Sequence, residues 1–127
     1  MAKIYYDKDA NLDFIKNKTI AIIGYGIQGR GQALNLRDSG LKVSVSELEG
    51  TDNYKKAKED GFEPVDVKTA TKNADIIQVL TQDHVQAAVY KKDIKKNLKA
   101  GKSLLFSHGF NIHFGQIKPP ADIDVFM

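Results

Sequence analysis

The chain has 127 residues, enough for one domain with a single core, and 42% of them are hydrophobic while 28% are charged. These proportions are typical of a soluble globular protein, and no apolar run approaches the roughly 20 residues that a membrane helix needs. The absence of cysteine excludes disulfides, zinc-thiolate sites and thiol nucleophiles. The N-terminus lacks the apolar core of a signal peptide, so we expect a cytoplasmic protein without a membrane partner.

Short β-rich apolar runs alternate with amphipathic stretches along the chain. In chain order these predict a strand (19–26), a helix (27–40), a strand (42–47), a helix (51–61), at most a short strand (63–67), a short helix (68–74), a strand (75–81), a helix (83–98) and a strand (102–108). Gly40 and Gly61 suit helix ends, and Thr51 or Asp52 suits an N-cap. A last strand-like run, 122–127, ends the chain at its most apolar point, so we expect a fragment of a longer protein.

Strands rich in Ile, Leu and Val that are separated by helices predict a parallel sheet buried on both faces. The fold class is therefore α/β, a doubly wound, mainly parallel, Rossmann-like sheet in one domain, 1–127. Net charge is only +3, from 19 basic and 16 acidic residues. The excess lies mostly in lysines at helical spacing, namely Lys91, Lys92, Lys95, Lys96 and Lys99. We interpret them as a solvated helix face and expect no nucleic-acid partner, because interleaved aromatic residues and a recognised motif are missing.

A glycine motif follows the first predicted strand directly. "GYGIQG" places Gly24, Gly26 and Gly29 in the pattern G-x-G-x-x-G, at the start of the first predicted helix. Gly24 permits a tight turn, Gly26 lets backbone N–H groups approach a pyrophosphate, and Gly29 lets the helix pack closely on the strand. An anion would then lie at the helix N-terminus. The motif predicts dinucleotide binding, and a glycine turn that serves packing alone is the alternative.

The second part of a dinucleotide site is an acid at the end of the second strand. Glu47 is the last residue of that predicted strand and follows Gly26 by 21 residues, the spacing at which a carboxylate binds the adenosine ribose. A carboxylate there favours a free 2′-hydroxyl over a 2′-phosphate, and no Arg lies between Val43 and Asp60. This favours NADH, although Lys55 and Lys56 could reach a phosphate and Glu47 could be ordinary loop charge.

Three longer stretches resemble the N-terminal domain of ketol-acid reductoisomerase, an enzyme of branched-chain amino-acid synthesis. They are "IGYGIQGRGQALNLRDSG" (Ile23 to Gly40), "DHVQ" (Asp83 to Gln86) and "HGFNIHFGQIKPP" (His108 to Pro120), and the resemblance covers essentially the whole chain. It implies conversion of 2-acetolactate or 2-aceto-2-hydroxybutyrate to a 2,3-dihydroxy acid. The implied reaction is a magnesium-dependent alkyl migration followed by hydride transfer from NAD(P)H.

The resemblance also assigns roles to residues. It makes His108 an active-site residue and two short segments cofactor contacts. Those segments are Tyr25 to Gln28 (Tyr25, Gly26, Ile27 and Gln28) and Asp83 to Gln86 (Asp83, His84, Val85 and Gln86), while Gly24 and Gly29 belong to the cofactor site through the glycine motif. Considered alone, His84 is more typical of an exposed side chain near a helix start, and His108 of a strand-end histidine bonded to backbone. His113 receives no catalytic role, and the scattered aspartates show no convergent metal spacing.

The sequence departs from the family in two places. Members that use NADPH typically carry an Arg and two Ser where this chain has Leu48, Thr51 and Asn53, so we expect those positions to contact the cofactor and NADH to be preferred. The family's helical C-terminal domain, whose carboxylates hold two magnesium ions, would begin beyond Met127. We therefore expect no metal ligand here, a chain that binds cofactor without turnover, and homo-oligomers only for the full-length protein.

Two other functions fit the same sequence. A stand-alone NAD(H)-sensing regulatory module would use cofactor binding to change a partner interaction instead of supporting chemistry. A structural domain without a ligand would need the glycine turn only for packing. The acetohydroxy-acid substrate belongs to the enzyme hypothesis alone. A calorimetric titration in which neither NADH nor NADPH binds would favour the structural domain.

Overall fold

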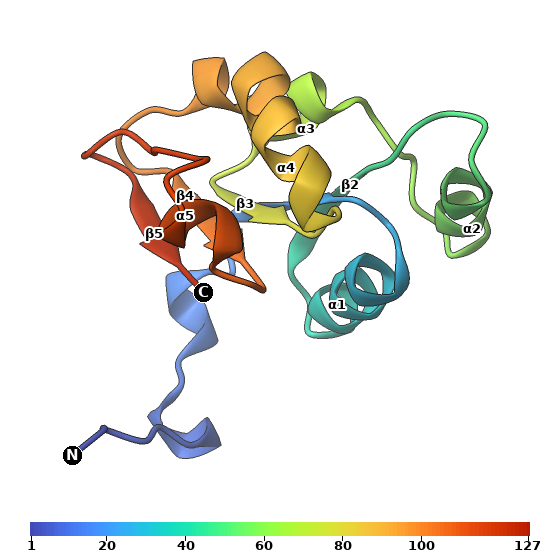
Figure 1. Ribbon diagram of the computed structural model, residues 1–127. Coiled ribbons are helices and arrows are strands. Elements are labelled where there is room, and N and C mark those ends of the chain that lie inside the picture. The colour runs from blue at the N-terminus through green and yellow to red at the C-terminus, as the bar shows by residue number, and fades with distance from the viewer.

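Five parallel strands form the centre of the computed structural model, which describes all 127 residues (Figure 1). They are β1 (Thr19–Ile23), β2 (Lys42–Ser46), β3 (Ile76–Val79), β4 (Ser103–Phe106) and β5 (Asp124–Phe126). Their order in the sheet is β2-β1-β3-β4-β5, and every neighbouring pair is parallel. The predicted doubly wound sheet is confirmed, and it is parallel throughout.

The short strand predicted at 63–67 is reduced to one bridge, between Ser46 of β2 and Val65. Val65 donates its N–H to the carbonyl of Val45 at 3.0 Å, and no second ladder bond follows. If Val65 is counted as a strand beside β2, the sheet has six strands. Numbered along the chain, with Val65 as the third, their order from edge to edge is 3-2-1-4-5-6, which is that of the dinucleotide-binding fold. The chain order reverses between β1 and β3, which is where ligands bind in such sheets.

Helices cover both faces of the sheet (Figure 1). They are α1 (Ile27–Asp38), α2 (Asp52–Glu59), α3 (Val67–Asn73), α4 (Asp83–Val89) and the single turn α5 (Phe110–His113). Ala33 of α1 and Ala57 of α2 pack with Ile20 and Ile22 of β1 on one face. The other face carries a second core, to which Ala70 of α3 contributes. Burial on both faces explains why the strands are almost continuously apolar.

The structure decides the N-cap of α2 and shows that the helix predicted at 83–98 is irregular. Thr51, not Asp52, is the N-cap of α2, because its hydroxyl accepts the N–H of Tyr54 at 3.1 Å. The predicted helix 83–98 has the right extent but is irregular, since α4 continues as a π-helix (Tyr90–Ile94) and a 3-10 turn (Lys95–Asn97). The carbonyl of Asp93 accepts side-chain bonds from Thr71 at 3.3 Å and Asn97 at 3.1 Å, which offset the disturbed backbone ladder.

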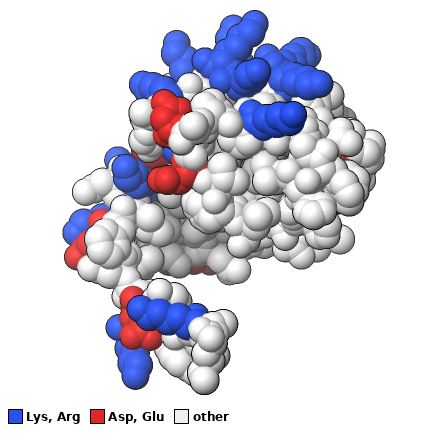
Figure 2. All heavy atoms as spheres, turned by 60° about the vertical axis from the view of Figure 1, so that its left-hand side comes forward, with Lys and Arg blue, Asp and Glu red and all other residues white.

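Lysines gather at the end of the molecule formed by α3 and the irregular continuation of α4 (Figure 2). The exposed members are Lys68, Lys72, Lys91, Lys92, Lys95, Lys96 and Lys99. Their exposure agrees with a solvated helix face. None of the helices combines the length and the apolarity required to cross a membrane.

Both ends of the chain carry exposed apolar side chains. The N-terminal segment, with 3-10 turns at Asp7–Asp9 and Leu12–Phe14, extends away from the sheet (Figure 1). The strand predicted at 122–127 is present as β5 on the edge beside β4. The apolar residues of β5 are not core residues, because Val125 and Phe126 remain 36% and 43% exposed, whereas Ile123, just before β5, is buried in the core.

Candidate functional site

The glycine turn between β1 and α1 forms one wall of the site. Gly24 has a φ of 97°, in the left-handed region that glycine favours, and a Cβ added to it would lie 3.0 Å from Cγ2 of Thr81. A Cβ on Gly29 would lie 1.9 Å from the carbonyl oxygen of Gly24. A Cβ on Gly26 would meet no atom within 4 Å. The first and third glycines are therefore required by packing, while the second faces open space.

Hydrogen-bonding groups surround this open space. Gly26 is the N-cap of α1 and provides no side-chain bond, so the first N–H groups of this 12-residue helix are free for a ligand. Beside Gly24, the hydroxyl oxygen of Thr81, just after β3, is buried without a hydrogen-bond partner. Free N–H groups and the helix dipole favour an anion, and an unpaired hydroxyl can donate to one. The turn fits the pyrophosphate of a dinucleotide.

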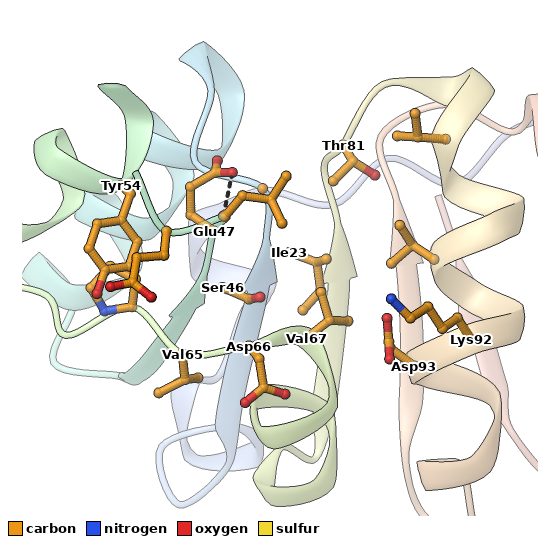
Figure 3. Close-up of a pocket in the computed structure, with 16 residues that line it drawn as sticks. Ile23, Ser46, Glu47, Tyr54, Val65, Asp66, Val67, Thr81, Lys92 and Asp93 are labelled. Atoms are coloured by element: carbon orange, nitrogen blue, oxygen red, sulfur yellow. Dashed lines mark hydrogen bonds between the residues drawn. The ribbon is translucent and has the colours of Figure 1, made fainter. Parts of the chain in front are cut away.

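A pocket of about 740 Å³ opens beside the turn (Figure 3). It lies at the carboxyl ends of β1, β2 and β3, at the point where the strand order reverses. Its lining comprises Ile23, Gly24, Ser46, Glu47, Leu48, Glu49, Tyr54, Pro64, Val65, Asp66, Val67, Thr81, Val85, Val89, Lys92 and Asp93. Mainly apolar walls with a few charged groups suit a heterocyclic base attached to polar sugars.

The carboxylate of Glu47 is fixed at the edge of this pocket. It accepts the backbone N–H of Tyr25 at 2.8 Å and that of Leu48 at 2.9 Å. A carboxylate has about four acceptor sites, so roughly two stay free for other donors. The strand end therefore presents an anchored negative charge that can still accept the two hydroxyls of a ribose.

Comparison with known proteins agrees with this geometry. Residues 14–127 match the family model described as the NADPH-binding domain of acetohydroxy acid isomeroreductase, which is another name for ketol-acid reductoisomerase. The chain belongs to the ketol-acid reductoisomerase family. It is 46% identical to an NADH-preferring ketol-acid reductoisomerase from an uncultured archean, with a TM-score of 0.92. That match covers 98% of this chain and 39% of the other, so the chain spans well under half of that reductoisomerase.

More distant structures share the fold alone. One is a semialdehyde dehydrogenase NAD-binding protein from Cupriavidus necator, solved with calcium and NAD, at 23% identity and a TM-score of 0.77; it is matched over 86% of this chain and 40% of its own. Another is an imine reductase from Myxococcus stipitatus, at 22% identity and a TM-score of 0.66, matched over 86% and 39%. These structures support the Rossmann-like architecture, while the NAD(P)-binding domain of an oxidoreductase family follows from the family match over residues 14–127.

The positions predicted to contact the cofactor, from the motif and from the family resemblance, lie in several parts of the structure. Gly24, Glu47, Leu48 and Val85 line the pocket. Gly26, Gly29, Ile27 and Gln28 belong to the adjoining turn and first helical turn, where Ile27 and Gln28 are exposed. Asp83, at the first position of α4, is half-buried outside the pocket. Asn53 and His84 are exposed and do not line it, while Thr51 is occupied as the cap of α2.

Two predicted contact residues have buried side chains. The ring of Tyr25 is 1% exposed and packs edge-on against Phe62 at 5.7 Å, so Tyr25 offers a ligand only its backbone. The amide of Gln86 donates to the carbonyl of Thr81 at 2.8 Å and accepts from Asn111 at 2.9 Å. Gln86 therefore holds the loop after β3 against α5, next to the unpaired Thr81 hydroxyl.

His108, the family's active-site histidine by resemblance, lies just after β4 and is exposed. Its Nδ1 accepts the N–H of Phe110 at 3.2 Å and lies 3.9 Å from a carboxylate oxygen of Asp83. In the neutral ring the proton is then on Nε2. His108 borders a second hollow of about 470 Å³, whose lining includes His113, Phe114 and Met127. The fold thus brings together Asp83 and His108 from separate segments.

Several pocket residues were not predicted from the sequence. Thr81 could have been found, because it follows a buried strand at the carboxyl edge of the sheet. Lys92 could not, because it enters the pocket lining from the π-helix, whose irregular turn leaves no local sequence signal. No group of three or more His, Cys, Asp or Glu side chains that could hold a metal ion occurs in the 127 residues.

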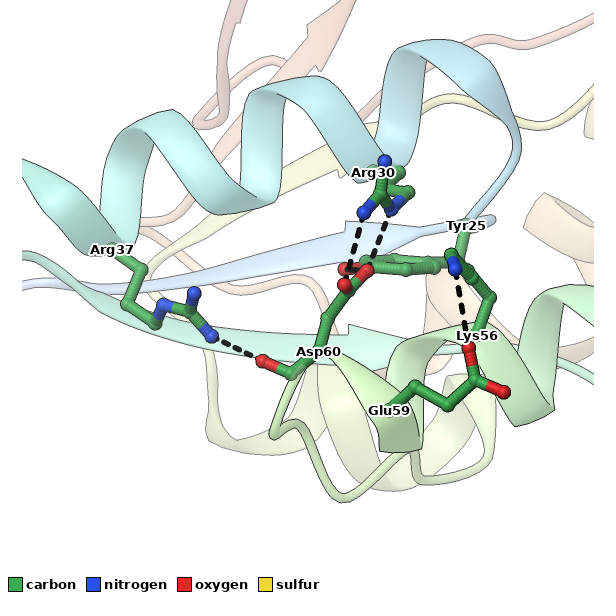
Figure 4. Close-up of polar contacts among 6 residues, drawn as sticks. All are labelled: Tyr25, Arg30, Arg37, Lys56, Glu59 and Asp60. Carbon is green, nitrogen blue, oxygen red and sulfur yellow. Dashed lines mark hydrogen bonds and ion pairs between the residues drawn. The ribbon is translucent and has the colours of Figure 1, made fainter.

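A polar cluster centred on Asp60 lies between α1 and α2, outside the pocket (Figure 4). The Asp60 carboxylate accepts two bonds from Arg30, at 2.6 and 3.0 Å, and one from the hydroxyl of Tyr25 at 3.0 Å. The bonds from Arg30 are the main cause that lowers the pKa of Asp60 to about 2. Burial, with the bond to Asp60, raises the pKa of Tyr25 to about 12. Both groups therefore keep their charge states across the physiological range.

This lowered pKa predicts a loss of stability in acid. Because the carboxyl of Asp60 has a lower pKa in the folded state than in the unfolded state, its contribution is present above about pH 4 and is lost as the pH falls toward 2. We expect Asp60→Asn to be less stable than the wild type at neutral pH and to converge on it near pH 2. Urea unfolding from pH 2 to 6 measures this. A constant difference across that range would contradict it.

Proposed function

We propose that this chain is the cofactor-binding part of a ketol-acid reductoisomerase and that it binds NADH in preference to NADPH. The observation that carries the proposal is the anchored carboxylate of Glu47, which lies at the end of β2 and at the edge of the pocket beside the glycine turn. Its free acceptor sites suit the 2′- and 3′-hydroxyls of the adenosine ribose. The free N–H groups of α1 and the Thr81 hydroxyl would hold the pyrophosphate.

The charges around the pocket support the preference for NADH. A 2′-phosphate would lie close to Glu47 and Glu49, where like charges repel. The two lysines that follow the loop are each paired with an acid of α2, Lys55 with Asp52 at 3.3 Å and Lys56 with Glu59 at 3.1 Å. Lys92 enters the pocket from the side away from Tyr54 (Figure 3). The 46% identical reductoisomerase is described as NADH-preferring, which agrees with this assignment.

In the complete enzyme, the proposed reaction converts an acetohydroxy acid to a dihydroxy acid. The bound nicotinamide supplies a hydride, and magnesium ions held by carboxylates outside this chain would polarise the substrate oxygens. This chain would hold the adenosine ribose at the pocket and the pyrophosphate at the turn, and would thereby limit where the nicotinamide can lie. His108 is exposed at the carboxyl edge of the sheet, where its Nε2–H can donate to a substrate oxygen, while its Nδ1 accepts the N–H of Phe110 and so restricts the orientation of the ring.

Gly26→Ala tests the proposed ligand site separately from the fold. The φ of Gly26 is −72°, which alanine adopts readily, and the added Cβ meets no protein atom within 4 Å. Because alanine is a poorer N-cap than glycine, we expect the free energy of unfolding to fall by no more than about 1 kcal/mol. We expect the Kd for NADH to rise at least about tenfold, because the methyl group would occupy the space reserved for the pyrophosphate.

Isothermal titration calorimetry with NADH and urea unfolding measure the two effects. Gly31→Ala is the matched control, because it adds the same methyl group to α1 in open space, away from the turn. It should leave the Kd unchanged. Equal affinity of Gly26→Ala and wild type would reject the pyrophosphate position, and wild-type protein that binds neither NADH nor NADPH would reject the proposed function.

A further inference from the structure

Tyr25 connects the ligand side of the glycine turn with the cluster on the opposite side. Its backbone N–H bonds to Glu47, which lines the pocket, while its hydroxyl bonds to Asp60, which does not. The ring between these two bonds is 1% exposed and packs against Phe62. A planar ring held at both ends cannot rotate independently, so the position of Asp60 constrains the backbone between Gly24 and Gly26.

Asp60 holds the helix after the turn as well. Arg30 lies in the first turn of α1, four residues beyond Gly26, and its guanidinium forms a two-bond fork with the Asp60 carboxylate. Arg37, two turns further along α1, donates to the carbonyl of Asp60 at 2.5 Å. Figure 4 shows both arginines reaching from α1 to the end of α2. The N-terminal N–H groups of α1 are thereby fixed relative to α2.

The contacts also form a closed connection around the turn. Glu47 begins the loop that leads into α2, and Asp60 ends that helix. Both residues bond to Tyr25, one to its backbone and the other to its side chain. The segment 47–60 therefore holds the turn from both ends.

We propose that Asp60 is a positioning residue for dinucleotide binding. It holds Tyr25 and Arg30 so that the glycine turn and the start of α1 keep the geometry that a pyrophosphate needs, although Asp60 itself touches no ligand. Because NADH and NADPH share the same pyrophosphate, loss of Asp60 weakens both to the same extent. This inference rests on the proposed function, and it differs from the role of Glu47, which changes the ratio of the two affinities.

The first test compares Asp60→Asn with Glu63→Gln. Glu63 lies three residues further on. Its side chain is 86% exposed, and its one ion pair is a 3.8 Å contact with Lys58. The substitution Glu63→Gln therefore removes the same negative charge as Asp60→Asn, but outside the cluster. Calorimetric titration gives the Kd for NADH and for NADPH. We expect Asp60→Asn to raise both by about tenfold, with their ratio unchanged within about twofold, and Glu63→Gln to change neither by more than about twofold.

The second test asks whether Asp60 acts through Tyr25. Tyr25→Phe removes one oxygen, keeps the buried ring, and is expected to raise both Kd values about threefold. If the hydroxyl transmits the effect, Asp60→Asn combined with Tyr25→Phe binds no more weakly than Asp60→Asn alone. If Asp60 and Tyr25 only stabilise the fold, the effects of Asp60→Asn and Tyr25→Phe on Kd would instead add in the double variant.

The outcomes separate the hypotheses. Folded Asp60→Asn that binds both nucleotides as tightly as Glu63→Gln would overturn the positioning role, as would additive effects in the double variant or a changed NADH to NADPH ratio. If Asp60→Asn does not fold, an unchanged Kd in Tyr25→Phe overturns it. Wild-type protein that binds neither nucleotide refutes the proposed function itself, whereas failure of the positioning role alone leaves wild-type binding intact.

Discussion

Gly29→Ala is expected to lower the free energy of unfolding by about 3 kcal/mol or more. The added Cβ would lie 1.9 Å from the carbonyl oxygen of Gly24 and 2.9 Å from its carbonyl carbon, so α1 would have to move away from β1. Gly24 cannot retreat, because it already packs against Thr81. Urea unfolding followed by circular dichroism measures the loss, and displaced α1 N–H groups should reduce NADH affinity as well.

Gly31→Ala provides the matched control for this prediction. Gly31 lies two residues further along the same helix, and a Cβ there meets nothing within 4 Å. Alanine favours an exposed helix position over glycine by about 0.5 to 1 kcal/mol, so this variant should be slightly more stable than the wild type. If both variants changed stability alike, close backbone packing would not be the reason for Gly29.

Glu47→Arg should change the cofactor preference by about 100-fold in favour of NADPH, measured as the ratio of the two Kd values. The substitution removes a carboxylate that repels a 2′-phosphate and supplies a cation that can pair with one. It also removes the acceptor of the Tyr25 N–H, so we expect NADH affinity to fall by more than the lost ribose bonds alone would cause. An unchanged ratio would show that Glu47 does not contact the ribose.

Glu49→Arg makes the same charge change two residues further on. Glu49 also borders the pocket, but it is exposed and makes no hydrogen bond to the turn. We expect it to change the Kd ratio by less than about threefold, through long-range charge that salt screens. If Glu49→Arg were as effective as Glu47→Arg, the preference would depend on the total charge of the loop instead of on one anchored carboxylate.

The elements that local chemistry determines could be predicted from the sequence. β1, the glycine turn and α1 follow from an apolar run and the spacing of Gly24, Gly26 and Gly29. Glu47 could be predicted because the end of a strand and a count of residues suffice to place it. Position at a strand end likewise places His108 at the carboxyl edge of the sheet, while its role follows only from resemblance.

The rest depends on contacts between distant segments. The bond from Tyr25 to Asp60 spans 35 positions and those from Arg30 span 30, so neither residue carries a local signal of its partner. The direction of the Tyr25 side chain, into the core and away from the ligand, is decided by packing against Phe62. Lys92 enters the pocket lining through the π-helix, which a tertiary bond from Thr71 of α3 to the Asp93 carbonyl helps to stabilise.

If Glu47 binds the ribose as proposed, its bond to the Tyr25 N–H would make cofactor preference an epistatic trait in this chain. A substitution that changes which nucleotide binds would also release the backbone of the proposed phosphate site, which serves either nucleotide. A route toward NADPH that begins with Glu47→Gln would keep a neutral acceptor for that N–H while removing the charge. Compensating changes for a full exchange are then to be sought around the turn, at residues that never contact the 2′ position.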